Sequence, residues 1–257
     1  REKRKTRGGR DGAVQNTSGL IRSIQVGLPS SEHSDCADDP DSTPWTTGMF
    51  KRSTPGQIRL GRHNLAGDGQ ADLVHHGGVD KAVCAYPSEH WLYWRGILPP
   101  HRLTGGVFGE NFTLEGLTEA DVCIGDVFSA GTAVVQISQP RQPCWKLARR
   151  WQIKDLAVQM ERTGFTGWYF RGIQEGTVEP GAPLQLMERP CPEWTVATAN
   201  RIMHHERNNL AAAEHLSLCP LLSASWQQTL RQRCHNQAGP DPQHRRFGTT
   251  HSSSSSL

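Results

Sequence analysis

The chain has 257 residues, which is long enough for one large domain or for a domain with a small addition. Its formal net charge is +3, but the first ten residues hold six Lys or Arg and one Glu, so the rest of the chain carries −2. This balance argues against a body that binds a nucleic acid polymer. No stretch approaches the roughly 18 apolar residues of a membrane-spanning helix, and we expect no membrane contact.

The seven cysteines lie at positions 36, 84, 123, 144, 191, 219 and 234, with no Cys-x-x-Cys pair and no spacing typical of a zinc site. An odd number without a framework indicates reduced thiols in a reducing compartment, so we expect a cytoplasmic protein. The sequence does not begin with Met and could be a fragment, which leaves organellar targeting open.

The chain starts with a polar, basic stretch, residues 1–18, which we expect to be a disordered arm; the end of a transit peptide is the alternative. Short apolar runs between turn residues then predict a series of strands. They are residues 20–28, 57–61, 82–86, 126–129, 133–138 and 183–187. So many short strands, with 26 Gly and 16 Pro in the chain, predict a mainly β barrel or sandwich with α additions over residues 19–190.

Helical patterns interrupt and follow these strands. A helix is expected over 88–95, where Gly96 ends it, and an apolar stripe over 153–160 is stopped by Gly164. Three more patterns, at 196–205, 209–218 and 223–233, predict a small three-helix domain over residues 195–234. Residues 235–257 are polar and end in serines, and we expect a disordered tail there.

One cysteine stands between a strand and a helix. The apolar run 133–138 leads to Pro140 and Arg141, and Pro143 fits the first position of a following helix. Cys144 would then be the second helical residue, where free backbone N–H groups favour an anion. A thiol in such a place typically has a pKa of roughly 3.5 to 7.5. Position alone leaves a second interpretation equally open, a buried structural cysteine.

Two glycine-rich segments carry further candidates. In the first, His76, Gly77, Gly78 and Lys81 could hold an anion through backbone N–H groups and a cation, or could form an ordinary turn. In the second, residues 105–112, Glu110 could donate a proton and Asn111 could make an amide contact, or the segment could be a hairpin with a solvated acid.

Two more cations follow Gly-containing segments. Lys51 comes after Gly48, and Arg171 follows the aromatic run 168–170, which fits a buried core better than a stacking platform. Each would be an ordinary surface charge if taken alone. Several cations and glycine turns together with one activated thiol suggest an anionic ligand that a cysteine touches.

Eight motifs in order give the chain a resemblance to the MOSC-domain family and, within it, to the YiiM family. They are VGLP (26–29), TGMFK (47–51), NLAGDGQAD (64–72), HGGVDKAV (76–83), YPSEH (86–90), FGEN (108–111), SQPRQPC (138–144) and TGWYFR (166–171). The resemblance covers about residues 23 to 233 and implies a MOSC-type β-barrel followed by a three-helix C-terminal domain.

The resemblance also implies a cofactor and an activity. The family's cofactor is the molybdenum cofactor, a pyranopterin dithiolene with molybdenum, to which a protein thiolate is a further ligand; here that residue is Cys144. The expected cofactor-binding residues are Lys51, Lys81, Arg141, Arg171, Asn111, Gly77 and Gly78. At the level of the family description, pyridoxal phosphate binding is also implied.

Relatives of this family reduce N-hydroxylated compounds, including hydroxylamino purines and amidoximes. The resemblance therefore implies an oxidoreductase whose substrate is a small N-hydroxylated molecule, with Cys144, His76 and Glu110 as catalytic residues and the last two as proton donors. The chain lacks the Cys-x₄-Cys-x₂-Cys spacing of a plant-type ferredoxin, so a separate electron-donor protein is expected. A homodimer stays open.

Two other functions compete with the reductase. Cys144 could carry a persulfide in a sulfur-carrier or cofactor-binding module without redox catalysis. It could also be the nucleophile of a cysteine hydrolase, which needs a His base beside it, but no family-specific hydrolase motif surrounds it.

Overall fold

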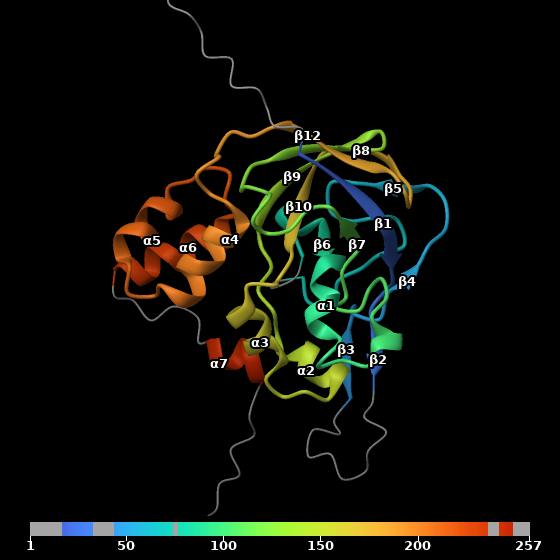
Figure 1. Ribbon diagram of the computed structural model, residues 1–257, viewed down its shortest axis with the longest axis horizontal. Coiled ribbons are helices and arrows are strands. Elements are labelled where there is room, and N and C mark those ends of the chain that lie inside the picture. The colour runs from blue at the N-terminus through green and yellow to red at the C-terminus, as the bar shows by residue number, and fades with distance from the viewer. Residues whose placement is uncertain (1–16, 33–43, 74–76, 236–241, 249–257) are drawn as a thin grey trace, which may run out of the picture.

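The computed structural model describes residues 17–32, 44–73, 77–235 and 242–248 (Figure 1). Its strands are β1 (Ser18–Val26), β2 (Ser30–Glu32), β3 (Trp45–Thr47), β4 (Arg52–Ser53), β5 (Ile58–Leu60), β6 (Val83–Pro87), β7 (Phe112–Glu115), β8 (Val127–Ala130), β9 (Ala133–Pro140), β10 (Trp168–Gln174), β11 (Gly176–Val178) and β12 (Pro183–Glu188). Its α-helices are α1 (Trp91–Trp94), α2 (Trp145–Trp151), α3 (Leu156–Thr163), α4 (Val196–Asn200), α5 (Leu210–Ser217), α6 (Ala224–Cys234) and α7 (Pro242–Phe247). Within these ranges no helix has the length and apolar character needed to cross a membrane.

Seven strands close into a barrel in the order β1-β12-β8-β9-β10-β6-β7, with β7 returning to β1. Only the pair β6 and β7 is parallel within this ring, and the other pairs are antiparallel. Strand β4 extends the sheet beside β1, and the pairs β2–β3 and β5–β11 form two small separate sheets. The predicted fold class, a β-barrel with helical additions, is therefore confirmed.

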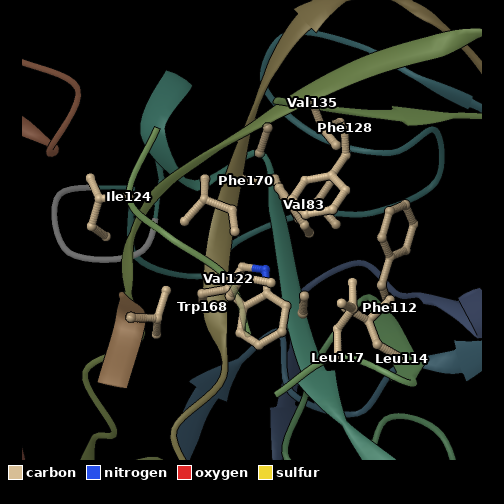
Figure 2. Packing of buried hydrophobic residues seen from close by; sticks show 14 of the residues in the cluster. Val83, Phe112, Leu114, Leu117, Val122, Ile124, Phe128, Val135, Trp168 and Phe170 are labelled. Atoms are coloured by element: carbon tan, nitrogen blue, oxygen red, sulfur yellow. The ribbon is translucent and has the colours of Figure 1, made fainter. Parts of the chain in front are cut away.

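Apolar side chains fill the inside of the barrel. Figure 2 shows Val83, Phe128, Val135 and Phe170 gathered there, and the rings of Phe128 and Phe170 meet edge to face at 6.1 Å. All five residues of β6 are buried, because helices cover its outer side while the core covers its inner side. Burial of each large apolar side chain contributes roughly 1.5 to 3 kcal/mol.

A second apolar cluster holds helices α1, α2 and α3 against the barrel. Trp94, Leu147, Trp151 and Met160 are among its buried members. Helix α3 ends at Gly164, whose φ of 76° lies in the left-handed region, so the stop expected from the sequence is present. This cluster fixes the position of α2, which begins immediately after Cys144.

The three helices that directly follow the barrel, α4, α5 and α6, match the sequence expectation in order, and side chains cap their starts. Thr195 accepts a hydrogen bond from the amide of Thr198, Asn209 from that of Ala212, and Ser223 from that of Trp226. The first expected helix changes character after Asn200 and continues as a π-helical turn over Arg201–His205.

Part of the expected disordered tail is a helix; residues 236–241 and 249–257 of that tail lie outside the described residues. Residues 242–247 form helix α7, which lies beside α2 (Figure 1). Its sequence carries no strong helical pattern, so contacts with the rest of the protein must hold it in place. The expected basic arm lies, apart from its last two residues, outside the described residues; Ser18 already belongs to β1.

Candidate functional site

Cys144 lies where the chain leaves the barrel and enters α2. The chain leaves β9 at Pro140, and the Arg141 amide donates to the carbonyl of Gly167 at 3.0 Å. Cys144 has extended backbone angles, φ −128° and ψ 168°, and precedes the first helical residue, Trp145. Its side chain is buried, with the residue 8% exposed. The thiol is therefore held in a fixed, largely water-free position.

The expectation that the helix starts at Pro143 is wrong. A helix from Pro143 would bond the Pro143 carbonyl to the amide of Leu147. Instead, the Leu147 amide donates to the Cys144 carbonyl at 3.1 Å, and the Pro143 carbonyl accepts a hydrogen bond from the Arg245 guanidinium. Cys144 is therefore the N-cap residue rather than the second helical residue.

Arg141 places a buried positive charge next to this thiol. Its Nη2 donates to the carbonyl of Phe108 at 2.6 Å, whereas the buried Nη1 has no hydrogen-bond partner among the described residues. Burial by itself would lower the pKa of Arg141, but coulombic interactions with neighbouring groups, Cys84 and Tyr169 first among them, outweigh it and raise that pKa. A buried cation with a free donor is suited to an anionic ligand.

Cys84 and Tyr169 also face Arg141. Burial raises the pKa of the Cys84 thiol, and burial together with Cys84 raises the pKa of Tyr169. Both groups therefore stay neutral near neutral pH, and neither cancels the charge of Arg141.

Glu110 is fully buried and holds the loop that faces Arg141. Its carboxylate accepts hydrogen bonds from the amides of Gly106 and Phe108, at 2.8 and 2.9 Å, and from the hydroxyl of Thr113 at 3.1 Å. These bonds fix the Phe108 carbonyl to which Arg141 donates. The structure thus gives Glu110 a positioning contact; its expected role as proton donor stays a prediction.

Lys51 and Asn111 meet at a second buried carboxylate, that of Asp68. The Lys51 ammonium pairs with Asp68 Oδ1, and Asn111 Nδ2 donates to Oδ2 at 3.0 Å. Asn111 also donates to the carbonyl of Gln25 and accepts from the amide of Cys84. The side chains of Lys51 and Asn111, both expected to bind the cofactor, are therefore engaged in contacts within the protein. These contacts join Asp68 to Gln25 of β1 and Cys84 of β6.

The remaining expected residues lie around the segment before β6. Arg171 pairs with Asp80 at 2.9 Å and donates to the carbonyl of Leu221 at 3.0 Å, so it joins the barrel to the C-terminal helices. Burial lowers the pKa of Lys81, which Asp80 and Asp72 partly offset.

The two expected glycines differ in what they require. A side chain at Gly77 would come within 2.9 Å of the backbone of Leu73, and Gly78 has a φ of 96°. Gly77 is therefore needed for close approach and Gly78 for its backbone conformation. His76 lies outside the described residues.

Arg150 is a further buried cation on α2, and the sequence pattern did not single it out. Its Nη1 donates to the carbonyl of Met49 at 2.6 Å, while its buried Nε lacks a partner in the described part of the chain. Burial, with Arg102 and Arg141 adding like charge, lowers the pKa of Arg150 to about 10. The cations of α2, just after Cys144, were the available signal.

Helix α2 also brings cations onto aromatic rings near the site. Arg149 Cζ lies 5.8 Å from the ring centroid of Trp45 and 5.4 Å from that of Trp145, and the Arg150 Cζ lies 5.0 Å from that of Phe50. Among the described residues, no three His, Cys, Asp or Glu side chains group in a way that could hold a metal ion. Cys144 thus lies in a cationic and aromatic setting, and Cys84 is a second thiol that acts on Arg141.

Two family descriptions match the chain. Residues 72–185 match the MOSC domain, and residues 194–237 match the YiiM-like, 3-alpha helix domain. The first range includes Cys144, Arg141 and Glu110, and the second covers α4, α5 and α6.

Relatives of known sequence extend over most of the described chain. The uncharacterized protein YflK of Bacillus subtilis (strain 168) is 49% identical over 187 residues, which are 73% of this chain and 84% of that protein. Protein YiiM of Escherichia coli (strain K12) is 38% identical over 196 residues, 76% of this chain and 86% of that protein. A protein named reductase from Gibberella moniliformis (strain M3125 / FGSC 7600) is 31% identical over 179 residues, 68% of this chain but 32% of that longer protein.

Solved structures give the same result for the fold. The crystal structure of YiiM from Geobacillus stearothermophilus has a TM-score of 0.67 and 43% identity, and covers 84% of this chain and 99% of its own. That of YiiM from Escherichia coli has a TM-score of 0.70 and 36% identity, and covers 77% and 95%.

Proposed function

Because this chain belongs to the MOSC domain family and carries the YiiM-like three-helix domain, we propose that it is a molybdenum cofactor-dependent reductase. Its substrates would be small N-hydroxylated compounds, such as hydroxylamino bases and amidoximes, and Cys144 would be the thiolate ligand to molybdenum. The observation that carries the proposal is the buried Cys144 next to Arg141, whose Nη1 is buried without a partner among the described residues. The relative named a reductase supports the reaction class.

The side chains present fit this cofactor. A thiolate is a soft ligand of the kind that molybdenum accepts, and a dithiolene cofactor needs only one further ligand from the protein. The cofactor's phosphate and dithiolene are anionic, and Arg141 Nη1 and Arg150 Nε are buried donors with no partner in the part of the chain that the structure describes. Buried cations and one thiol thus supply what the group requires.

Some of these residues would bind the cofactor, and others keep the binding residues in position. Cys144 would hold the metal, and its burial would exclude water from the reacting bond. Arg141 and Arg150 would bind the anionic part, while Glu110 keeps the Phe108 carbonyl in place for Arg141. The bound cofactor would supply a two-electron reduction.

Protons for the departing oxygen and for the nitrogen must come from side chains or water. His76 stays our candidate donor. Glu110 is the other candidate; its carboxylate accepts two hydrogen bonds at Oε1 and one at Oε2, so a proton would sit on the remaining lone pair of Oε2. Electrons would come from a separate protein.

The experiment compares the wild-type chain with Cys144→Ala, using Cys123→Ala as the matched control. Cys123 is also buried, but its thiol donates to the carbonyl of Pro192, just before the C-terminal helices. Molybdenum content and the reduction rate of an N-hydroxylated base with a viologen dye as electron source are measured for each. We expect both to fall at least about tenfold in Cys144→Ala alone, consistent with loss of a metal ligand.

A sulfur carrier is the second candidate, because a buried cysteine beside a cation could equally hold a persulfide anion. It predicts sulfane sulfur on Cys144, no molybdenum and no reductase rate. The same preparations distinguish the two.

A further inference from the structure

Helix α7 lies after the last residue that either family description matches, yet it contacts the element that starts at the site. It packs against α2, and a Cβ at Gly248, the residue after it, would contact the ring of Trp145 at 3.4 Å. Figure 1 shows α7 next to α2 and α3. A segment far from the barrel in sequence therefore reaches the neighbourhood of Cys144.

Arg245 on α7 makes two contacts at once. Its Nη2 forms an ion pair with Glu161 Oε1 at 2.6 Å, and its Nη1 donates to the carbonyl of Pro143. Pro143 is buried, so this carbonyl has little access to water. Glu161, on α3, thus anchors a guanidinium that reaches the peptide directly before Cys144.

Arg246 also pairs with Glu161 but makes no contact with Pro143. Its Nε and Nη2 donate to the other oxygen of Glu161, at 2.9 and 2.6 Å. His204 Nδ1 lies 3.7 Å from the same oxygen, but burial lowers the pKa of His204 to about 3, so it is neutral. The two arginines therefore balance the charge of Glu161 in similar ways, and of these two only Arg245 contacts Pro143.

We propose that Arg245 is a positioning residue that fixes the conformation of the Cys144 loop. Proline favours the first position of a helix, and the Pro143 carbonyl could accept from the Leu147 amide. With Arg245 on that carbonyl, the chain at Cys144 stays extended and α2 begins at Trp145. Without it, the loop would exchange between this conformation and a helix that starts at Pro143, and the Cys144 thiol would no longer be fixed.

The test uses the full chain expressed without molybdate, so that its result is independent of the proposed reductase. The variants are Arg245→Ala, Arg245→Lys and the matched control Arg246→Ala. Each is treated with iodoacetamide at one pH, and the alkylation rates of Cys144, Cys123 and Cys219 are followed by peptide mass spectrometry. The last two cysteines are buried elsewhere and report general loosening of the fold.

In Arg245→Ala we expect Cys144 to react about tenfold faster than in the wild type, as loss of one charge-assisted hydrogen bond predicts, with the other two cysteines unchanged. Arg246→Ala should leave the Cys144 rate within about twofold. Arg245→Lys should keep part of the slow alkylation of Cys144, since an ammonium can donate to one acceptor. It lacks the two parallel N–H donors with which a guanidinium reaches Glu161 and Pro143 together. Equal rates at Cys144 in both alanine variants, or parallel acceleration of all three cysteines, would overturn the proposal.

Discussion

Arg141 donates a 2.6 Å hydrogen bond to the carbonyl of Phe108, and this contact joins the segment that carries Cys144 to the loop that Glu110 holds. Phe108 itself is fully buried between Tyr86 and Trp94, with ring centroids 4.5 and 5.4 Å away. The cation beside the thiol is thus fixed by the barrel core. The site depends on packing as well as on charge.

Replacement of Arg141 tests this link. Arg141→Ala leaves the buried Phe108 carbonyl without its donor, which should lower the free energy of unfolding by about 1 to 3 kcal/mol in a urea titration. It should also lower molybdenum content at least about tenfold, because a buried cation near the thiol is lost. Arg141→Lys keeps the charge and should retain part of the metal; equal loss in both variants would argue that shape rather than charge matters.

Glu110→Gln separates a positioning role from proton donation. The glutamine amide keeps one acceptor oxygen but turns an N–H₂ toward donors that need an acceptor, so we expect a loss of about 1 to 3 kcal/mol in unfolding free energy. A variant as stable as the wild type but without reductase activity would instead favour the proton-donor role.

The buried pair of Lys51 and Asp68 predicts a compensating double mutant. Lys51→Met leaves a buried carboxylate unpaired and should cost about 3 to 5 kcal/mol of stability. The double variant Lys51→Met with Asp68→Asn removes both charges and should recover most of this loss. If the double variant regains the fold but no molybdenum, Lys51 also binds the cofactor; if it regains both, the pair serves the fold alone.

His204 makes stability depend on pH. Its pKa is about 3 in the folded protein because of burial, whereas the unfolded chain takes up a proton below about pH 6.5. The unfolded state therefore binds more protons between these values, and the free energy of unfolding falls as the pH falls. Between pH 7.5 and 5.0 the loss should be about 2 kcal/mol.

Two variants check the source of this loss. His204→Gln should remove most of it, and His215→Gln, on the exposed side of α5, should keep it. The measurement stays above pH 5 because the carboxyl of Glu161, whose pKa the ion pairs with Arg245 and Arg246 lower against the effect of burial, adds a loss of the same sign at lower pH. An unchanged slope in His204→Gln would contradict the account.

Local patterns in the sequence predicted most of the barrel. The β-branched run before Pro140 predicted β9, and Asn209 and Ser223 stand where the starts of α5 and α6 require caps. Strand β10 was not predicted, because Trp168, Tyr169 and Phe170 form a continuous aromatic run and do not alternate with polar residues. It forms by pairing with β9 and β6, which lie far from it in sequence.

The site was harder to predict for the same reason. The sequence singled out Cys144 and Arg141 from a strand, a proline and a cation. It could not show that Asp68 engages Lys51, or that Arg245 reaches Pro143 from 102 residues away. Contacts of this kind form only in the completed fold, and local sequence propensity does not predict them.

The central claim is that Cys144 holds a molybdenum centre that reduces N-hydroxylated compounds. The most direct measurement is the molybdenum content per chain of the wild type, Cys144→Ala and Cys123→Ala, each purified in parallel and assayed with an N-hydroxylated base. The account predicts metal and reductase activity in the wild type and in Cys123→Ala, and neither in Cys144→Ala. Molybdenum and activity in Cys144→Ala equal to those of the wild type would contradict it.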